Sequence, residues 1–216
     1  MKIFFTQIFI LLSIFGYSQI IEHECPDGST LKKQNLSNKT ICMCADGKVL
    51  NGMTIIYDSD SNKIEENHWN KGVKTGTWKN WASNGTLIYE ATYVKGRKFG
   101  FEKYYYSDGQ LKSSTSYAFD IKNGPETFYF VNGNKKTLTI FSNNLKSGRI
   151  AEWNQDGIQI VEGAFINDVK NGIWIFRLPD FKNVAVVRFK DGKEEMSIKI
   201  EWTENNLPVS LGEKLK

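Results

Sequence analysis

The sequence predicts an all-β protein, an elongated single-layer antiparallel β-meander of repeated β-hairpins. Three observations predict this fold. Glycines recur every 24 residues, at Gly52, Gly76, Gly100, Gly124, Gly148 and Gly172. The ninth place of each unit is always Asn or Asp, and the eighteenth is always aromatic, as in Asn84 and Tyr93 of the second unit. A fixed period of this length is the signature of a repeat architecture.

Each unit carries the signal for one hairpin. Asn or Asp followed by Gly favours a two-residue type I′ turn, at Asn84-Gly85, Asp108-Gly109, Asn132-Gly133 and Asp156-Gly157. Counting outward from that loop places Gly76 opposite Tyr93, so that a ring covers a bare glycine backbone. Neither face of such a hairpin is apolar enough for a deep core. We therefore expect one ribbon of about 58 Å, from twelve strands at about 4.8 Å each.

The chain divides into four parts. Residues 1–18 read as a signal peptide, because Lys2 precedes a short apolar run that ends in small residues. A membrane anchor is the alternative, but the run is shorter than the roughly 20 residues that span a bilayer. Residues 19–51 are an N-terminal Cys-containing cap segment, 52–195 are the six repeats, and 196–216 are a C-terminal cap strand and tail. The predicted location is therefore the periplasm, the cell envelope or the outside of the cell.

The cap segment contains all three cysteines of the chain, Cys25, Cys42 and Cys44. In an exported protein, a disulfide from Cys25 to Cys42 or Cys44 is the first interpretation. His23 and the three thiols also form a set that zinc accepts, which is the second interpretation.

The last repeat departs from the pattern. Asp180-Phe181 stands where the turn is expected, and Met196 to Trp202 alternates like one further strand. Leu207-Pro208 then predicts the end of the ladder, because proline donates no ladder hydrogen bond.

The second unit, Gly76 to Gly100, follows the pattern G-x-W-x-x-[YW]-x-x-[ND]-G-x-L with an aromatic and a G-x-x-x-G linker. This pattern resembles the MORN repeat in its longer bacterial variant, and the resemblance covers residues 52–195. It weakens in the later units, since the tryptophan of the third place returns only at Trp174. The resemblance implies a hairpin array with a binding role, often labelled an antitoxin in bacteria and linked to membrane lipids or scaffolding in eukaryotes. It brings no catalytic residues.

Two rows of side chains are candidates for binding. A basic row occupies the twenty-third place: Lys74, Lys98, Lys122, Lys146 and Lys170. It reads either as a strip along one long margin for anionic lipid or polysaccharide, or as a device that keeps a thin sheet soluble. An aromatic row occupies the sixth place, interrupted only by Arg177: Tyr57, Trp81, Tyr105, Tyr129 and Trp153. It reads either as an anchor for a protein or glycan, or as packing within the sheet.

Composition and motifs narrow the function. A net charge of +4, from 28 basic and 24 acidic residues, is too small for a nucleic-acid clamp. No nucleophile elbow, phosphate loop or zinc-binding helix is present, so we expect no enzyme and no cofactor. The sequence predicts an exported MORN-like scaffold that binds another protein, including an antitoxin-like role. Peripheral binding to anionic lipid or envelope polysaccharide is the alternative. Choline- or glycan-binding wall repeats fit less well, because their period is shorter.

Overall fold

The computed structural model describes residues 31–36, 39–44, 50–58, 60–178, 182–202 and 208–211, and for 31–44, 202 and 208–211 the backbone alone. The expected signal peptide lies outside the described residues, as does Cys25. The strands are β1 (Leu31–Leu36), β2 (Lys39–Cys44), β3 (Gly52–Tyr57), β4 (Lys63–Asn70), β5 (Val73–Trp81), β6 (Leu87–Val94), β7 (Arg97–Tyr105), β8 (Leu111–Ala118), β9 (Ile121–Tyr129), β10 (Lys135–Ser142), β11 (Leu145–Trp153), β12 (Gln159–Ile166), β13 (Val169–Arg177), β14 (Val184–Lys190), β15 (Lys193–Trp202) and β16 (Pro208–Leu211).

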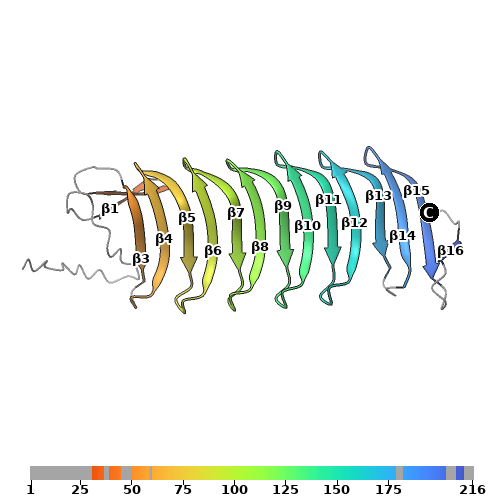
Figure 1. Cartoon of the computed structure of the whole chain (residues 1–216), viewed down its shortest axis with the longest axis horizontal. Coiled ribbons are helices and arrows are strands. Elements are labelled where there is room, and N and C mark those ends of the chain that lie inside the picture. The colour runs from red at the N-terminus through yellow and green to blue at the C-terminus, as the bar shows by residue number, and fades with distance from the viewer. Residues whose placement is uncertain are drawn as a thin grey trace, which may run out of the picture.

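The predicted fold class is confirmed. Strands β3 to β16 form one open antiparallel sheet in which every strand pairs with its neighbour in sequence (Figure 1). Strands β1 and β2 form a separate two-stranded antiparallel sheet. The described residues contain no helix, and accordingly no helix that could cross a membrane. Each hairpin can therefore contact only the hairpins beside it, as in other repeat proteins.

The predicted pairing of glycine with an aromatic residue is confirmed in all six units. The pairs are Gly52–Trp69, Gly76–Tyr93, Gly100–Tyr117, Gly124–Phe141, Gly148–Phe165 and Gly172–Phe189. All six glycines have positive φ, between 61° and 125°. This conformation is unfavourable for residues with a Cβ, which explains why glycine recurs at the first place.

The predicted type I′ turn at Asn-Gly and Asp-Gly is wrong in its type and loop length. In the second unit the amide of Ala82 donates to the Thr86 carbonyl at 2.8 Å, and the amide of Gly85 donates to the Ala82 carbonyl at 2.8 Å. Gly85 has a φ of +83°, whereas Asn84 is not among the residues with positive φ. The loop is therefore a type I turn followed by a glycine bulge, with three residues in place of two.

The Asn or Asp of the ninth place stabilises the turn through its side chain, whereas the prediction was that it adopts positive φ. The Asn84 side chain accepts a hydrogen bond from the Thr86 amide at 3.0 Å, and Asp108 accepts one from the Gln110 amide at 2.9 Å. Short polar side chains stabilise type I turns in this way without adopting positive φ.

The type I′ turns lie at the opposite ends of the strands, in the linkers between units. Both central residues have positive φ there, for example Lys95-Gly96 at 50° and 82° and Asn143-Asn144 at 51° and 68°. The second residue also holds the neighbouring hairpin: the Asn144 carboxamide accepts a hydrogen bond from the Lys122 amide at 2.8 Å. Asp120 and Asp168 form the same bond one unit before and one unit after.

The sheet continues past the point where the sequence predicts its end. Strand β15 covers the expected strand over 196–202, and β16 then adds a short edge strand that begins at Pro208. Pro208 pairs with Trp202 as the first residue of that edge strand, a position in which a missing N–H is tolerated.

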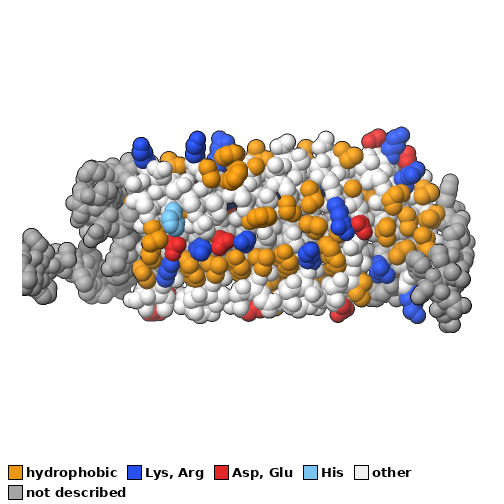
Figure 2. Space-filling model, in the orientation of Figure 1, with side chains coloured by type: hydrophobic (Ala, Val, Ile, Leu, Met, Phe, Trp, Pro, Cys, Tyr) orange, Lys and Arg blue, Asp and Glu red, His pale blue; other side chains and the backbone are white. Residues whose placement is uncertain are grey.

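The two faces of the sheet differ in burial. Trp78, Tyr93 and Ala91 share one face, which we call the Trp78 face, and Tyr93 and Ala91 are buried on it. Near the C-terminal end the same face carries a cluster of buried Ile150, Trp174 and Val187. The other face, which we call the His68 face, carries His68, the one histidine among the described residues, and is turned to the viewer in Figure 2, where histidine is pale blue.

Candidate functional site

The aromatic row lies on the His68 face. Its five rings, which we call the aromatic band, come from alternate strands: Tyr57, Trp81, Tyr105, Tyr129 and Trp153. Tyr104 and Tyr105 illustrate the alternation, because the Tyr104 hydroxyl points to Glu102 on the Trp78 face whereas Tyr105 interacts with Glu90 and Lys103. All five rings are partly exposed. The register therefore brings together, across five hairpins, residues that are 24 apart in sequence.

Local contacts hold the band against the sheet. The ammonium group of Lys63 lies 4.2 Å from the centroid of the Trp81 ring, and that of Lys135 lies 5.8 Å from the Trp153 ring. Such cation–π contacts contribute about 0.5–1 kcal/mol at exposed sites. Partial burial, reinforced by the negative charge of Glu90, raises the pKa of Tyr105, so that its phenol stays neutral. Trp81 and Trp153 are thus held in place while part of each ring remains accessible.

Figure 2 shows a band of hydrophobic side chains that runs along much of the His68 face. Beside it, cross-strand pairing aligns a row of alternating charge: Glu66, Lys79, Glu90 and Lys103. Lys103 and Glu90 form a salt bridge of 3.1 Å within this row. Opposite charges on neighbouring strands stabilise a sheet, and the row therefore has a structural explanation.

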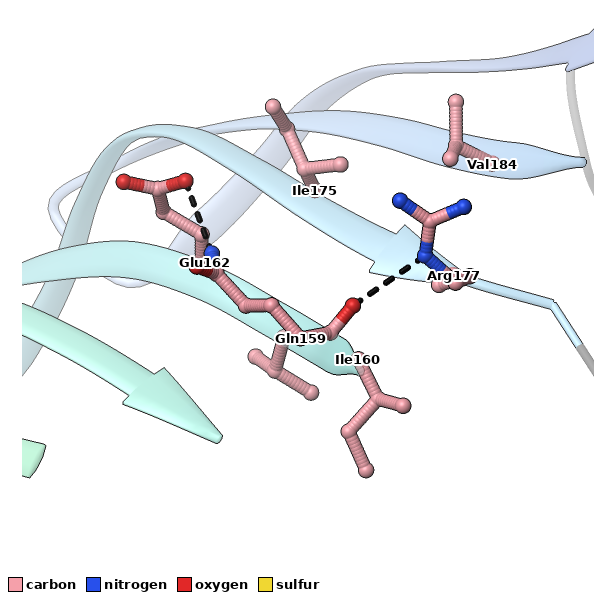
Figure 3. A pocket seen from close by; sticks show the side chains of 7 residues that line it. Gln159, Ile160, Glu162, Ile175, Arg177 and Val184 are labelled. Atoms are coloured by element: carbon pink, nitrogen blue, oxygen red, sulfur yellow. Dashed lines mark hydrogen bonds between the residues drawn. The ribbon is translucent and has the colours of Figure 1, made fainter. Parts of the chain in front are cut away.

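The band ends in a shallow hollow of about 290 Å³ at Arg177, which occupies the sixth place of the last unit (Figure 3). Ile160, Ile175 and Val184 form its apolar part. The Nε atom of Arg177 donates to the Gln159 carbonyl at 3.1 Å. The hollow lies where the other units carry a large ring.

Glu162 is the one acidic residue that lines this hollow. Its carboxylate is held by the Gln159 carboxamide at 2.8 Å and by the Arg149 guanidinium at 3.0 Å. Its negative charge is therefore largely compensated, and Arg177 gives the hollow a cationic rim.

The basic row lies on the opposite, Trp78 face and differs from the exposed strip that is one of its two interpretations. Each of its ammonium groups lies over the ring nineteen residues further on, at centroid distances of 5.0, 5.0, 4.9, 5.2 and 5.0 Å for Lys74–Tyr93, Lys98–Tyr117, Lys122–Phe141, Lys146–Phe165 and Lys170–Phe189. All five lysines are half-buried. Their stems and charges cover the aromatic rings, a role that neither interpretation of the sequence includes.

Two of these lysines also neutralise glutamates that the sequence analysis does not single out. Lys98 pairs with Glu102, and Lys122 pairs with Glu126, each at 2.5 Å. Glu102 is only 7% exposed and also accepts a hydrogen bond from the Tyr89 hydroxyl at 3.1 Å. The sequence contains a pattern that could have identified these glutamates. Both occupy the third place of their unit, where Trp78 stands in the second unit.

This buried network raises the pKa values of two of its members, Tyr89 and Lys98. Burial, reinforced by the hydroxyl of Tyr93, raises the pKa of Tyr89 well above its ordinary value. Burial alone would lower the pKa of Lys98, but the hydrogen bond to Glu102 outweighs it and the pKa is raised. The network therefore keeps Lys98 charged and Tyr89 neutral, which suits a structural role.

The structure does not connect the cysteines with the aromatic band or with the basic row. Cys42 and Cys44 lie on β2 opposite Lys33 and Leu31, as backbone positions only. The disulfide and the zinc site both stay predictions. Within residues whose side chains are described, no group of three or more His, Cys, Asp or Glu residues is placed to hold a metal ion.

Comparison of the sequence with protein-family models and with curated proteins gives no match. The resemblance to the MORN repeat therefore rests on the motif in the sequence alone.

Proposed function

We propose that this chain is an exported, non-enzymatic MORN-like repeat protein that binds a partner protein through the aromatic band. The difference between the two faces carries the proposal. On the Trp78 face a row of five rings lies under lysines of the same chain, whereas in the described part of the His68 face only two of the five band rings, Trp81 and Trp153, have a lysine over them. Tyrosine and tryptophan are enriched among residues that dominate binding energy at protein interfaces.

The shape of the molecule supports the same proposal. A single-layer sheet offers an extended surface, and the hollow at the end of the band is shallow. An antitoxin-like role is one version of this function, with a toxin protein as the partner.

Attachment to anionic lipid or polysaccharide through the basic row receives less support. Lys98 and Lys122 are paired with glutamates, and all five ammonium groups lie over rings. Releasing them toward an anionic surface would break these contacts and leave Glu102 unpaired in a buried position. Each such cation gains only about 1 kcal/mol near an anionic membrane.

Capture from an envelope fraction tests the proposal. Immobilised wild-type protein should retain a partner saturably, and Tyr105→Ala should weaken that retention about tenfold, the scale of an interface hot spot. Tyr104→Ala is the matched control, because Tyr104 is the adjacent residue in β7 and lies on the opposite face. Equal loss in both variants, or none in Tyr105→Ala, contradicts the proposal.

A further inference from the structure

We propose that the occupant of the aromatic band is an acidic, proline-containing segment in the polyproline II conformation. This inference rests on the proposed function, since it names the chemistry of the partner for the same surface.

The spacing of the band is the first argument. Its rings come from every second strand of one continuous sheet, from β3 to β11. Two inter-strand spacings separate neighbouring rings by about 9.6 Å. A ligand that uses all of them must present equivalent side chains at this interval along a line that crosses the strands.

The polyproline II helix matches this interval. It has three residues per turn and a rise of about 3.1 Å, so equivalent side chains return every 9.3 Å or so. Over the four steps of the band, the mismatch amounts to about 1.2 Å. Two turns of an α-helix cover about 10.8 Å, which accumulates a mismatch of about 4.8 Å over the same distance. Side chains of a β-strand return to the same face after roughly 6.7 Å, which does not match the interval of about 9.6 Å between the rings.

The chemistry of the rings is the second argument. Aromatic-lined surfaces bind proline-rich segments because proline rings pack against aromatic faces, and the segment is extended before it binds. A polyproline II chain makes no internal hydrogen bonds, so its carbonyl groups can accept bonds from tyrosine and tryptophan. The band consists of three tyrosines and two tryptophans.

Charge is the third argument. The cross-strand partners of Tyr57 and Tyr129 within the band are Lys63 and Lys135, and the sixth position of the row is Arg177. The corresponding partners of the other rings are uncharged: Leu87, Leu111 and Gln159. Lys63 forms an ion pair with Glu66, so the positive charge along the row lies chiefly at Lys135 and Arg177, which favours acidic residues between the prolines of the ligand toward that end.

The hollow at Arg177 completes the match. It follows Trp153 by the same two-strand step and places a guanidinium beside Ile175 and Val184 (Figure 3). An apolar side chain of the ligand fits where the sixth ring is missing, and a neighbouring carboxylate of the ligand meets Arg177.

Titration of synthetic peptides tests the inference. A twelve-residue peptide of repeated Pro-Pro-Glu, which adopts polyproline II, should bind the full chain saturably, as measured by calorimetry. A Gly-Gly-Glu peptide of equal length has the same charge but a flexible backbone, and should bind at least about tenfold more weakly. Equal binding of the two peptides, or no binding of Pro-Pro-Glu to folded protein, overturns the inference.

Variants locate the binding. Trp153→Ala should weaken Pro-Pro-Glu binding about tenfold or more, whereas Phe128→Ala, a 40% exposed ring on the Trp78 face, should leave it unchanged. Arg177→Gln provides a test that does not remove a ring: it should weaken Pro-Pro-Glu and leave a Pro-Pro-Gln peptide unaffected. If Arg177→Gln weakens the binding of both peptides, the assigned pairing of Arg177 with a carboxylate of the ligand is wrong.

The outcomes separate this inference from the function on which it rests. If the Pro-Pro-Glu peptide does not bind while capture of a partner still depends on Tyr105, the proposed function is supported and the inference about the ligand is wrong. If capture is also insensitive to Tyr105→Ala, both fall. Displacement of a captured partner by a β-linked glucan oligosaccharide, and not by Pro-Pro-Glu, assigns the rings to sugar stacking and also overturns the inference.

Discussion

The indole of Trp174 lies directly on Gly163, so close that a Cβ at residue 163 would come within 2.3 Å of the ring. Gly163 has no positive φ, so space alone requires glycine there. Trp174 is 3% exposed and anchors the buried cluster with Ile150 and Val187. In a sheet without a second layer, this contact between neighbouring strands replaces part of a core.

Gly163→Ala should lower the free energy of unfolding by about 2–3 kcal/mol, because the indole has to move out of its packed position. Urea unfolding measures this change. Gly172→Ala is the control: its Cβ meets nothing within 4 Å, but its φ is +76°, so only backbone strain of about 1 kcal/mol applies. In a Trp174→Leu background the penalty at residue 163 should shrink, and an unchanged penalty argues against the contact.

Replacing Lys122 should cost more stability than replacing Lys146. Both lysines lie over a phenylalanine ring, at 4.9 and 5.2 Å. Lys122 also pairs with Glu126, whereas the residue four places after Lys146 is Ile150. We expect Lys122→Met to lose about 1–3 kcal/mol, because a largely buried carboxylate loses its salt bridge and keeps only the hydrogen bond from the Thr115 hydroxyl. Lys146→Met should lose about 0.5–1 kcal/mol, the value of a cation–π contact. Equal losses in chemical denaturation contradict the assigned role of the salt bridge.

Stability should decline above about pH 10. The pKa of Tyr89 is raised in the folded protein by burial and by the Tyr93 hydroxyl, whereas the unfolded chain ionises near the ordinary value of 10.0. The pKa of Lys98 is also raised, from 10.5, because Glu102 outweighs the effect of burial. In both cases the unfolded state loses its proton first as the pH rises, so the contribution is complete below these values and is lost above them.

Urea unfolding between about pH 8 and pH 11 checks this direction. The decline should be shallower in Tyr89→Phe, which removes one of the shifted groups. A stability that stays constant across this interval in the wild-type chain rules out the proposed linkage.

Lys95→Asn should stabilise the protein by about 0.5–1 kcal/mol, because Lys95 has a φ of +50° in a type I′ turn for which Asn-Gly is preferred. Thermal unfolding measures the change. Gln155→Asn is the control, since Gln155 lies in a type I loop and has no positive φ. A gain of the same size in both variants would point to composition and against turn geometry.

The repeat made the architecture accessible to prediction from the sequence. Glycine at the first place and an aromatic residue at the eighteenth fix the register, and Gly148 indeed lies opposite Phe165. The turn type was harder to predict, because Asn-Gly accommodates both a type I′ turn and a type I turn with a bulge. The added glycine bulge at Gly85 changes the loop by one residue, which local sequence alone does not reveal.

The candidate surfaces were predicted less completely. Spacing in sequence places Lys98 and Lys122 in one row, but the direction of their side chains depends on the neighbouring strand that supplies Tyr117 and Phe141. The burial of Glu102 could not be predicted from the sequence, because it depends on contacts with Tyr89 from another strand. The hollow beside Arg177 lies where arginine replaces the aromatic residue of the sixth place. That replacement is visible in the sequence, whereas the volume of the hollow is not.

Site-specific photo-crosslinking at two adjacent residues of β7 tests the central claim, that the His68 face is the binding surface. A photoreactive amino acid at position 105 lies in the aromatic band, and the same amino acid at position 104 lies on the Trp78 face. Irradiation in the native envelope fraction should yield one saturable cross-linked protein from position 105 and none from position 104. Cross-links from position 104 alone, or with equal yield from both, contradict the account.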